Sequence, residues 1–501
     1  MKTLIELIQV VKDISLKPSD FMTTDKKQTR EQEYYDKILA GDFLTDADAS
    51  QFFFKDSPSH SNYKRLKGSL RDRLINTLFF YKSKEKANDY FEANIYCSKN
   101  LLASRLLMIL FSRNAGIDLC QKVLRRALEI EHSEYIVAAS KDLRLLMSAD
   151  KGDTKKFKYY NDLYKKYKTI LDAESLAEEY YCLLILPYVK SKQKREDTSP
   201  QARKYYEQLS PLLEKYTSPR LHMFGRAIEV IIYLAINDYQ TVIKLCDEAY
   251  TFFQRKEYNY YTPIKLFAHQ ELISCIQLKN YQQGKKAIEK TFTITRQGVK
   301  NWYYNQELYL MLTLHSKEYD EAYHVLDSVI NSNNFSKSQS FTKERWEIHK
   351  AYIDFLIYIK KIRVVEKKRF RMGKFLNSVP IYSKDKRGLN IPILIVQLLF
   401  MIVKKDYDQS LERFDAIQKY CSRYIKKGDN LRSNCFINML LQIPKARFHK
   451  AGVIRKAQKY YDQLLATPLE VSGQTHEIEI IPYEDLWAFI LESLETKRYD
   501  K

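Results

Sequence analysis

Apolar residues along this chain recur with the spacing of paired helices. Between Pro263 and Asn333 two helical hairpins follow one another, and a short polar turn divides each of them, Lys279-Asn280-Tyr281 in the first and Lys317-Glu318-Tyr319 in the second. A small or apolar residue follows each tyrosine at offsets of 3, 7 and 10. Such offsets lie on one face of an α-helix. The residues are Gly284, Ile288 and Thr291 after the first turn and Ala322, Leu326 and Val329 after the second.

The same unit recurs along most of the chain. The predicted second helices start 38 to 47 residues apart, at Phe157, Ser199, Tyr239, Tyr281, Tyr319, Ile362, Tyr407 and Ile454. A period near 42 residues that recurs seven times is typical of a solenoid and not of separate globular domains. We therefore predict an all-α protein, an α-solenoid of about eight to nine antiparallel helical hairpins over residues 85–470.

The second helices share an order of aromatic, small, large and small residues. Three of them carry it, in part or in full: Tyr239, Val242, Cys246 and Ala249; Tyr319, Ala322, Leu326 and Val329; Tyr407, Ser410, Phe414 and Ile417. This pattern resembles the tetratricopeptide repeat, although the period is longer than that family's 34 residues. The first helices depart from the family, with Val230, Leu272, Leu310 and Leu398 where it keeps a glycine. The resemblance implies stacked hairpins with a concave binding face, and it implies no substrate or catalytic residue.

The N-terminal region, residues 1–84, has a different pattern. It predicts short helices over 31–40, 46–54 and 61–81, and the last carries a stripe of Leu66, Leu70, Leu74 and Leu78. This layout is that of a helix-turn-helix unit, in which the last helix enters the major groove of DNA. Alternatively the region is a structural cap on the array, which we favour because solenoids need a terminal unit to cover an apolar face. The nucleic-acid hypothesis assigns base or phosphate contacts to Lys64, Arg65, Lys67 and Arg71.

Positive charge is concentrated in one insertion, which we call the basic stretch (residues 360–390). The chain carries 83 Lys and Arg against 62 Asp and Glu, a net charge of +21. Eleven cations and two acids give the basic stretch a charge of +9, and Gly373, Pro380 and Gly388 predict a loop in its second half. We predict that it docks an acidic partner. The predicted partner-binding residues are Lys367, Lys368, Arg369, Arg371, Lys374, Lys384, Lys386 and Arg387.

The C-terminal segment, residues 471–501, has the opposite charge. Six acids and no Lys or Arg fall between His476 and Glu495, and the pattern predicts a final amphipathic helix over Tyr483–Glu495. A solvated acidic cap is the simplest interpretation, since charge runs are usually surface. Contact with the basic stretch, or with another copy of the chain, is the alternative.

Motifs for catalysis, cofactors and metals are absent from the sequence. The nine histidines form no H-E-x-x-H motif, and the 12 glycines form no phosphate-binding loop. The seven cysteines include no C-x-x-C pair, and Cys120, Cys246 and Cys275 are expected to be buried thiols. We expect no enzyme activity, cofactor or metal. The N-terminus does not resemble a secretory signal, and no apolar run approaches the roughly 18 residues that a membrane span needs. We therefore expect a cytoplasmic protein that does not associate with a membrane.

Two functional hypotheses follow. The first is a non-enzymatic interaction, scaffold or regulatory protein that binds a protein or peptide partner, acidic in character, on the helical-repeat surface. The alternative is a nucleic-acid-binding regulator that uses the helix at 61–81, the basic residues at 360–388, or both. The sequence leaves the partner's identity and the oligomeric state open.

Overall fold

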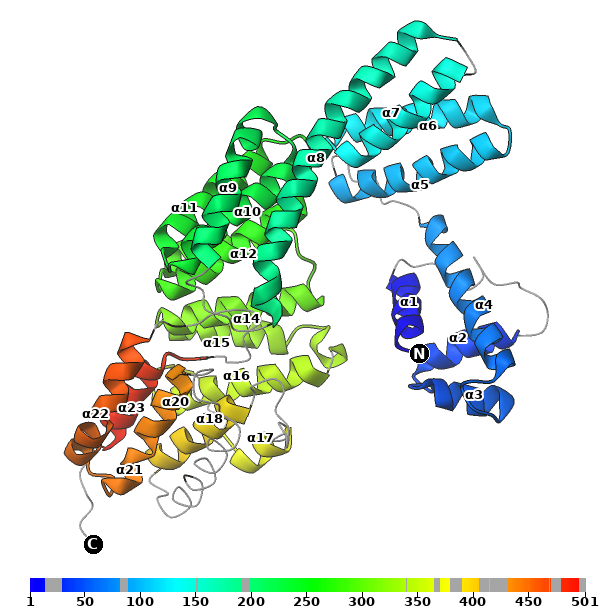
Figure 1. Ribbon diagram of the computed structural model, residues 1–501. Coiled ribbons are helices and arrows are strands. Elements are labelled where there is room, and N and C mark those ends of the chain that lie inside the picture. Colours follow the sequence, from blue (N-terminus) through cyan, green and yellow to red (C-terminus); the bar gives the residue numbers. More distant parts are fainter. Residues whose placement is uncertain are drawn as a thin grey trace. The chain divides into compact units, whose positions relative to one another are not determined.

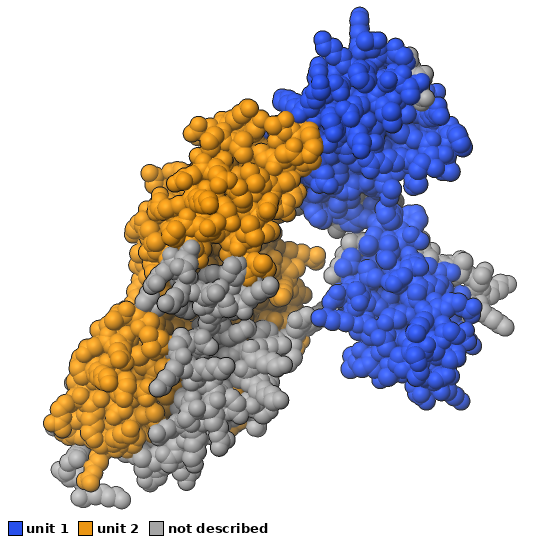
Figure 2. Space-filling model, viewed as in Figure 1, with its two compact units in different colours: residues 1–167 blue, residues 168–501 orange. Residues whose placement is uncertain are grey.

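The computed structural model describes residues 1–13, 29–81, 89–149, 152–190, 198–338, 340–364, 370–378, 390–404, 414, 431–467, 469 and 479–494. In this part of the chain the regular elements are helices, with no β-strand. Helices that are neighbours in sequence pack against one another (Figure 1). The all-α helical-repeat fold predicted from the hydrophobic pattern is confirmed. The chain divides into two compact units, residues 1–167 and 168–501 (Figure 2).

Unit 1 contains a small helical cluster followed by stacked helices. In the cluster, Thr45 caps α3 and exchanges hydrogen bonds with Asp48, as in a capping box. Tyr34 and Tyr63 meet in its core with their hydroxyl oxygens 2.9 Å apart. The elements are α1 (Lys2–Asp13), α2 (Arg30–Ala40), α3 (Asp46–Phe54), α4 (Ser61–Thr77), η2 (Leu78–Phe80), α5 (Tyr90–Ile109), α6 (Arg113–Glu129), α7 (Ser133–Ala149) and the first part of α8 (Thr154–Lys190).

Unit 2 begins within α8 and contains further helices. Its further elements are α9 (Thr198–Lys215), α10 (Pro219–Ala235), α11 (Tyr239–Gln254), α12 (Tyr261–Gln277), α13 (Tyr281–Phe292), α14 (Lys300–His315), α15 (Tyr319–Ile330), η4 (Phe335–Lys337), α16 (Ser340–Tyr358), α17 (Met372–Ser378), α18 (Asn390–Val403), α20 (Leu431–Leu440), α21 (Gln442–Lys445), α22 (Lys450–Ala466) and α23 (Tyr483–Leu494). As predicted, second helices begin at Tyr239, Tyr281 and Tyr319.

The same turn joins the helices of three successive hairpins. Its middle residue has left-handed φ, 59° at Asn237, 54° at Lys279 and 64° at Lys317. The next backbone N–H then reaches back to a carbonyl in the last turn of the first helix, for example from Asn280 to Cys275 at 2.9 Å. This is a Schellman-type ending, which satisfies carbonyls that the helix leaves open. The same type of turn therefore joins α10 to α11, α12 to α13 and α14 to α15.

The core of unit 2 is continuous from α12 to α23. The helix α18 is buried on nearly every side, as its apolar sequence predicts, and Phe400 there packs edge-on to Phe355 of α16. Each fully buried Leu, Ile or Phe contributes roughly 1.5–3 kcal/mol. One predicted helix start is wrong: Ile362 is buried in a non-helical segment after α16. The predicted start at Tyr407 lies outside the described residues.

Candidate functional site

The basic stretch is described only in part. Lys367, Lys368, Arg369, Lys384, Lys386 and Arg387 lie outside the described residues. Arg371 and Lys374 are described; both are exposed, and neither forms an ion pair with a described residue. The aromatic side chains beside them hold this segment in place, because Phe370 stacks on Phe400 of α18 with ring centroids 4.0 Å apart. Two cations therefore project from a segment that is anchored by aromatic packing.

The cations predicted to contact nucleic acid are divided between two environments on α4. Lys67 donates to Asp46 at 2.6 Å, and Asp46 also binds the Met1 amino group at 2.9 Å. Burial raises the pKa of Asp46, but hydrogen bonds from Lys67 and Tyr63 outweigh burial and hold it well below its usual range. Arg71 pairs with the adjacent Asp72 at 3.0 Å. Lys64 and Arg65 are exposed.

Three lysines face the acidic C-terminal segment: two from the turns of successive hairpins and one from the segment that follows α16. We call Lys279, Lys317 and Lys361 the turn-lysine row. Their ion-pair partners are Glu484 at 3.7 Å, Asp485 at 2.9 Å and Glu492 at 3.2 Å, respectively. All three acids belong to α23. The acidic segment is thus held against the array, and one of its contacts, through Lys361, reaches the basic stretch.

Aromatic and apolar packing accompanies these ion pairs. The ring of Phe489 lies against Tyr319 with centroids 6.3 Å apart, and the Lys361 ammonium sits 5.0 Å from the centre of the same ring. Leu486, Trp487 and Ile490 are buried in the core of unit 2. The array therefore holds an acidic helix by combining lysines on its turns with an aromatic anchor between them.

Arg432 of α20 fixes the start of the C-terminal segment. Its guanidinium makes two bonds to Glu479, at 2.9 and 2.8 Å, and one to Glu484 at 2.6 Å. The remaining two go to the carbonyls of Leu464 and Thr467 at the end of α22, at 3.0 and 2.8 Å. All five donors of the guanidinium are used, and they join three parts of the chain.

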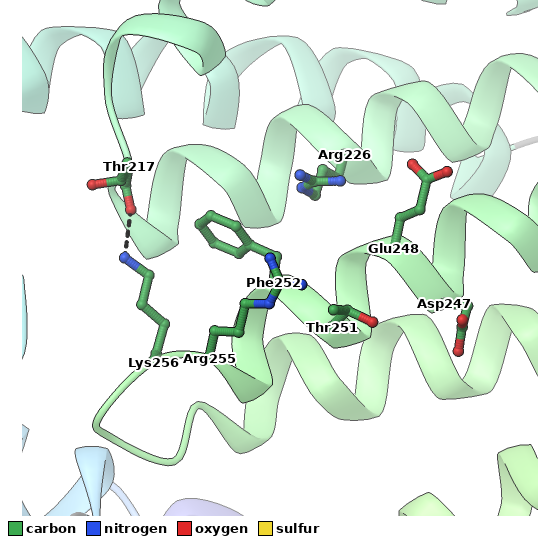
Figure 3. A pocket seen from close by; sticks show the side chains of 8 residues that line it. All are labelled: Thr217, Arg226, Asp247, Glu248, Thr251, Phe252, Arg255 and Lys256. Atoms are coloured by element: carbon green, nitrogen blue, oxygen red, sulfur yellow. Dashed lines mark hydrogen bonds between the residues drawn. The ribbon is translucent and has the colours of Figure 1, made fainter.

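A second candidate site is an open pocket, which we call the Phe252 pocket, between α10 and α11 (Figure 3). Its volume is about 620 Å³, within the usual range for small-molecule sites. Figure 3 shows Asp247 and Glu248 toward one side of the pocket, and Lys256 and Thr217 toward the other. The lining residues are Thr217, Arg226, Asp247, Glu248, Thr251, Phe252, Arg255 and Lys256.

The buried His222 positions Phe252 and Arg226 in this pocket. The ring of His222 stacks on Phe252, with centroids 4.1 Å apart. Its Nε2 donates to the carbonyl of Tyr216 at 2.9 Å, and because a carbonyl only accepts, the proton resides on Nε2. Burial lowers the pKa of His222 to about 4, so the ring is neutral at pH 7. Its Nδ1 then accepts from Nε of Arg226 at 3.4 Å.

The charges around the Phe252 pocket are unevenly paired. Asp247 pairs with Lys290 at 3.4 Å, and Glu248 with Lys244 at 4.0 Å. Neither Arg226 nor Arg255 forms an ion pair with a carboxylate in the described chain, and Arg255 is exposed. Lys256 donates to the carbonyl of Thr217 at 2.8 Å. The acids already have cations beside them, whereas the two arginines present guanidinium charge to the pocket.

The described residues give no support for a metal site, a reactive cysteine or a membrane-spanning helix. They contain no group of three or more His, Cys, Asp and Glu side chains that would hold a metal ion. Burial raises the pKa of the Cys120 and Cys275 thiols to about 12, which leaves them protonated and unreactive at neutral pH. None of the described helices has the length and apolar character needed to cross a membrane.

Sequence reasoning missed the Phe252 pocket entirely. The one signal in the sequence was the spacing of His222 and Arg226, one helical turn apart, which places both on one face of α10. That spacing does not reveal that Phe252 and Arg255 of the next helix lie beside them.

Comparisons of the chain with protein-family models, with curated proteins and with solved structures gave no match.

Proposed function

We propose that this protein is a non-enzymatic interaction protein that binds an acidic segment of a protein partner on its helical repeats. The observation that supports the proposal is the contact between the turn-lysine row and α23. It is an example, within one chain, of these repeats holding an acidic helix. A partner of the same chemistry, acidic with an aromatic anchor, suits the cations that the array leaves exposed.

We assign the partner contact to the basic stretch and test it there at Arg371 and Lys374. Both are exposed without an ion pair among the described residues, while the turn-lysine row is already occupied by α23. An exposed ion pair is worth roughly 0.2–1 kcal/mol. Stable binding of the partner therefore needs several such contacts together with an aromatic anchor, and the affinity is expected to fall as salt is added.

The experiment compares charge reversal at two places in the full-length chain. Arg371→Glu with Lys374→Glu is expected to abolish capture of the acidic partner from lysate, as identified by mass spectrometry. Lys64→Glu with Arg65→Glu, an equal change of charge on α4, is the control and is expected to leave capture intact. Equal capture by the Arg371 and Lys374 variant and the wild type contradicts the assignment.

The alternative, a nucleic-acid-binding regulator, has less support. On α4 two of the four predicted contacts, Lys67 and Arg71, already pair with carboxylates of the chain. A gel-shift assay at about 50 and 200 mM salt separates the two functions, since phosphate contacts lose affinity steeply over that range. Salt-sensitive DNA or RNA binding that disappears in the Lys64 and Arg65 variant favours this alternative.

A further inference from the structure

We propose that the Phe252 pocket binds a small phosphate monoester, whose phosphate is held by Arg226 and Arg255 and whose organic part lies beside Phe252. The pocket shares no residue with the partner surface proposed above. The two proposals therefore stand or fall separately.

The charge of the pocket fits a phosphate better than a carboxylate. A phosphate monoester carries about −1.5 to −2 at pH 7, with three strong acceptor oxygens, whereas a carboxylate carries −1. Arg226, Arg255 and Lys256 line the same pocket, and the planar guanidinium matches phosphate oxygens in a two-pronged geometry.

Arg226 is held in place before any ligand binds. His222 is fixed by the carbonyl of Tyr216 and accepts from Nε of Arg226, so the terminal nitrogens of that guanidinium are the ones left for a ligand. The guanidinium carbon also lies 5.2 Å from the centre of the Phe252 ring. A side chain positioned in this way loses less conformational entropy on binding, which increases affinity.

The remaining walls determine which kind of phosphate fits. The pocket's volume of about 620 Å³ leaves room for an organic group beyond the phosphate, beside Phe252. Asp247 and Glu248 on the other side accept hydrogen bonds from hydroxyl or amino groups. The expected ligand is therefore a small phosphorylated molecule that bears hydroxyl or amino groups.

Calorimetric titration of the full-length protein with phenyl phosphate tests the proposal. We expect saturable binding that weakens at least tenfold in Arg255→Gln and in Arg226→Gln, since each removes a charged hydrogen bond. Arg255 is exposed, so its variant is expected to fold normally, and circular dichroism checks both. Arg296→Gln, a change at an exposed arginine after α13 that does not line the pocket, is the matched control and is expected to change affinity less than twofold.

Three outcomes overturn the proposal. The first is no saturable binding of phenyl phosphate to the wild type. The second is an equal loss of affinity in Arg296→Gln, which means that general surface charge attracts the probe. The third is that benzoate, or a peptide carrying phosphoserine, binds as tightly as phenyl phosphate, which removes either the phosphate or the small-molecule part of the assignment.

Discussion

Replacement of Arg432 by methionine is expected to release the C-terminal segment from the array. Methionine fills much of the space of the arginine stem but carries no charge and no donor. The change leaves Glu479, which is buried, and Glu484 without their main cation, and it also frees the carbonyls of Leu464 and Thr467. The perturbation therefore acts on three parts of unit 2 through one side chain.

The size of the effect follows from the burial of the pair. Removing one partner of a buried ion pair typically destabilises by about 3–5 kcal/mol, because the other charge remains without compensation. Glu479 can instead take up a proton and lose its charge in the variant, so the free energy needed to protonate it sets an upper limit on that loss. Neutralising a carboxyl of ordinary pKa near 4.3 takes about 4 kcal/mol at pH 7 and about 1 kcal/mol at pH 5, at 1.36 kcal/mol for each pH unit. We thus expect a loss of about 3–4 kcal/mol at pH 7 that shrinks toward pH 5.

Hydrogen exchange followed by mass spectrometry measures this loss where it occurs. Ends of repeat arrays can open locally, so a peptide covering residues 479–494 reports the opening of α23 itself. A loss of 3–4 kcal/mol corresponds to roughly two to three orders of magnitude in protection, since 1.4 kcal/mol is a factor of ten. The matched control is Arg455→Met, an exposed arginine on α22, which is expected to leave protection unchanged.

A loss below about 1 kcal/mol at pH 7 contradicts this reasoning, because an ion pair of that strength behaves like an exposed one. A loss of the same size at pH 5 and at pH 7 contradicts the role assigned to the uncompensated glutamate. Either result means that apolar packing of α23, through residues such as Trp487 and Ile490, holds the segment without Arg432.

Two further predictions concern buried polar groups of unit 2. Glu307 is buried between Arg345 and His349, so Glu307→Gln is expected to lower the free energy of unfolding in urea by about 2–4 kcal/mol. The control is the exposed Glu318, where the same change is expected to alter that free energy by less than about 0.5 kcal/mol. Equally small effects of the two substitutions contradict the prediction. Burial lowers the pKa of both His222 and His315 to about 4, below the unfolded value near 6.5, so their contribution to stability is complete above pH 6.5 and is lost as the pH falls toward 4. Urea unfolding between pH 7 and 4.5 is expected to show that slope, and His315→Gln to reduce it; a slope equal to that of the wild type contradicts the assignment.

The repeat architecture was predictable because it depends on short-range pattern. The landmarks at Tyr281 and Tyr319 identify helix starts, since the offsets that follow them describe a single helical face. Ile362 has a comparable position in the pattern, yet no helix begins there, and the chain turns into the basic stretch instead. Periodicity gives the position of a repeat but not whether an insertion replaces its second helix.

The sites were not predictable because they depend on contacts between distant residues. His315 donates from Nε2 to the carbonyl of Glu479, 164 residues later, and no spacing rule connects the two. The Phe252 pocket likewise combines the first helix of one hairpin with the second. The acidic run favoured a solvated cap, with contact to the basic stretch only as the alternative, and it did not identify the lysines that pair with α23.

The turn lysines show how one position serves both local structure and surface chemistry. Lys279 and Lys317 have left-handed φ, which costs a residue other than glycine roughly 1–2 kcal/mol. Their ion pairs with α23 return roughly 0–1 kcal/mol each, because both lysine side chains are well exposed. Glycine would therefore make both turns at least as stable, and what lysine adds is positive charge at the same place in the α12–α13 and α14–α15 hairpins. The equivalent turn of α10–α11 carries the uncharged Asn237, so the charge is confined to two neighbouring hairpins, whose lysines contact one acidic helix together. This supports the proposed binding of an acidic partner.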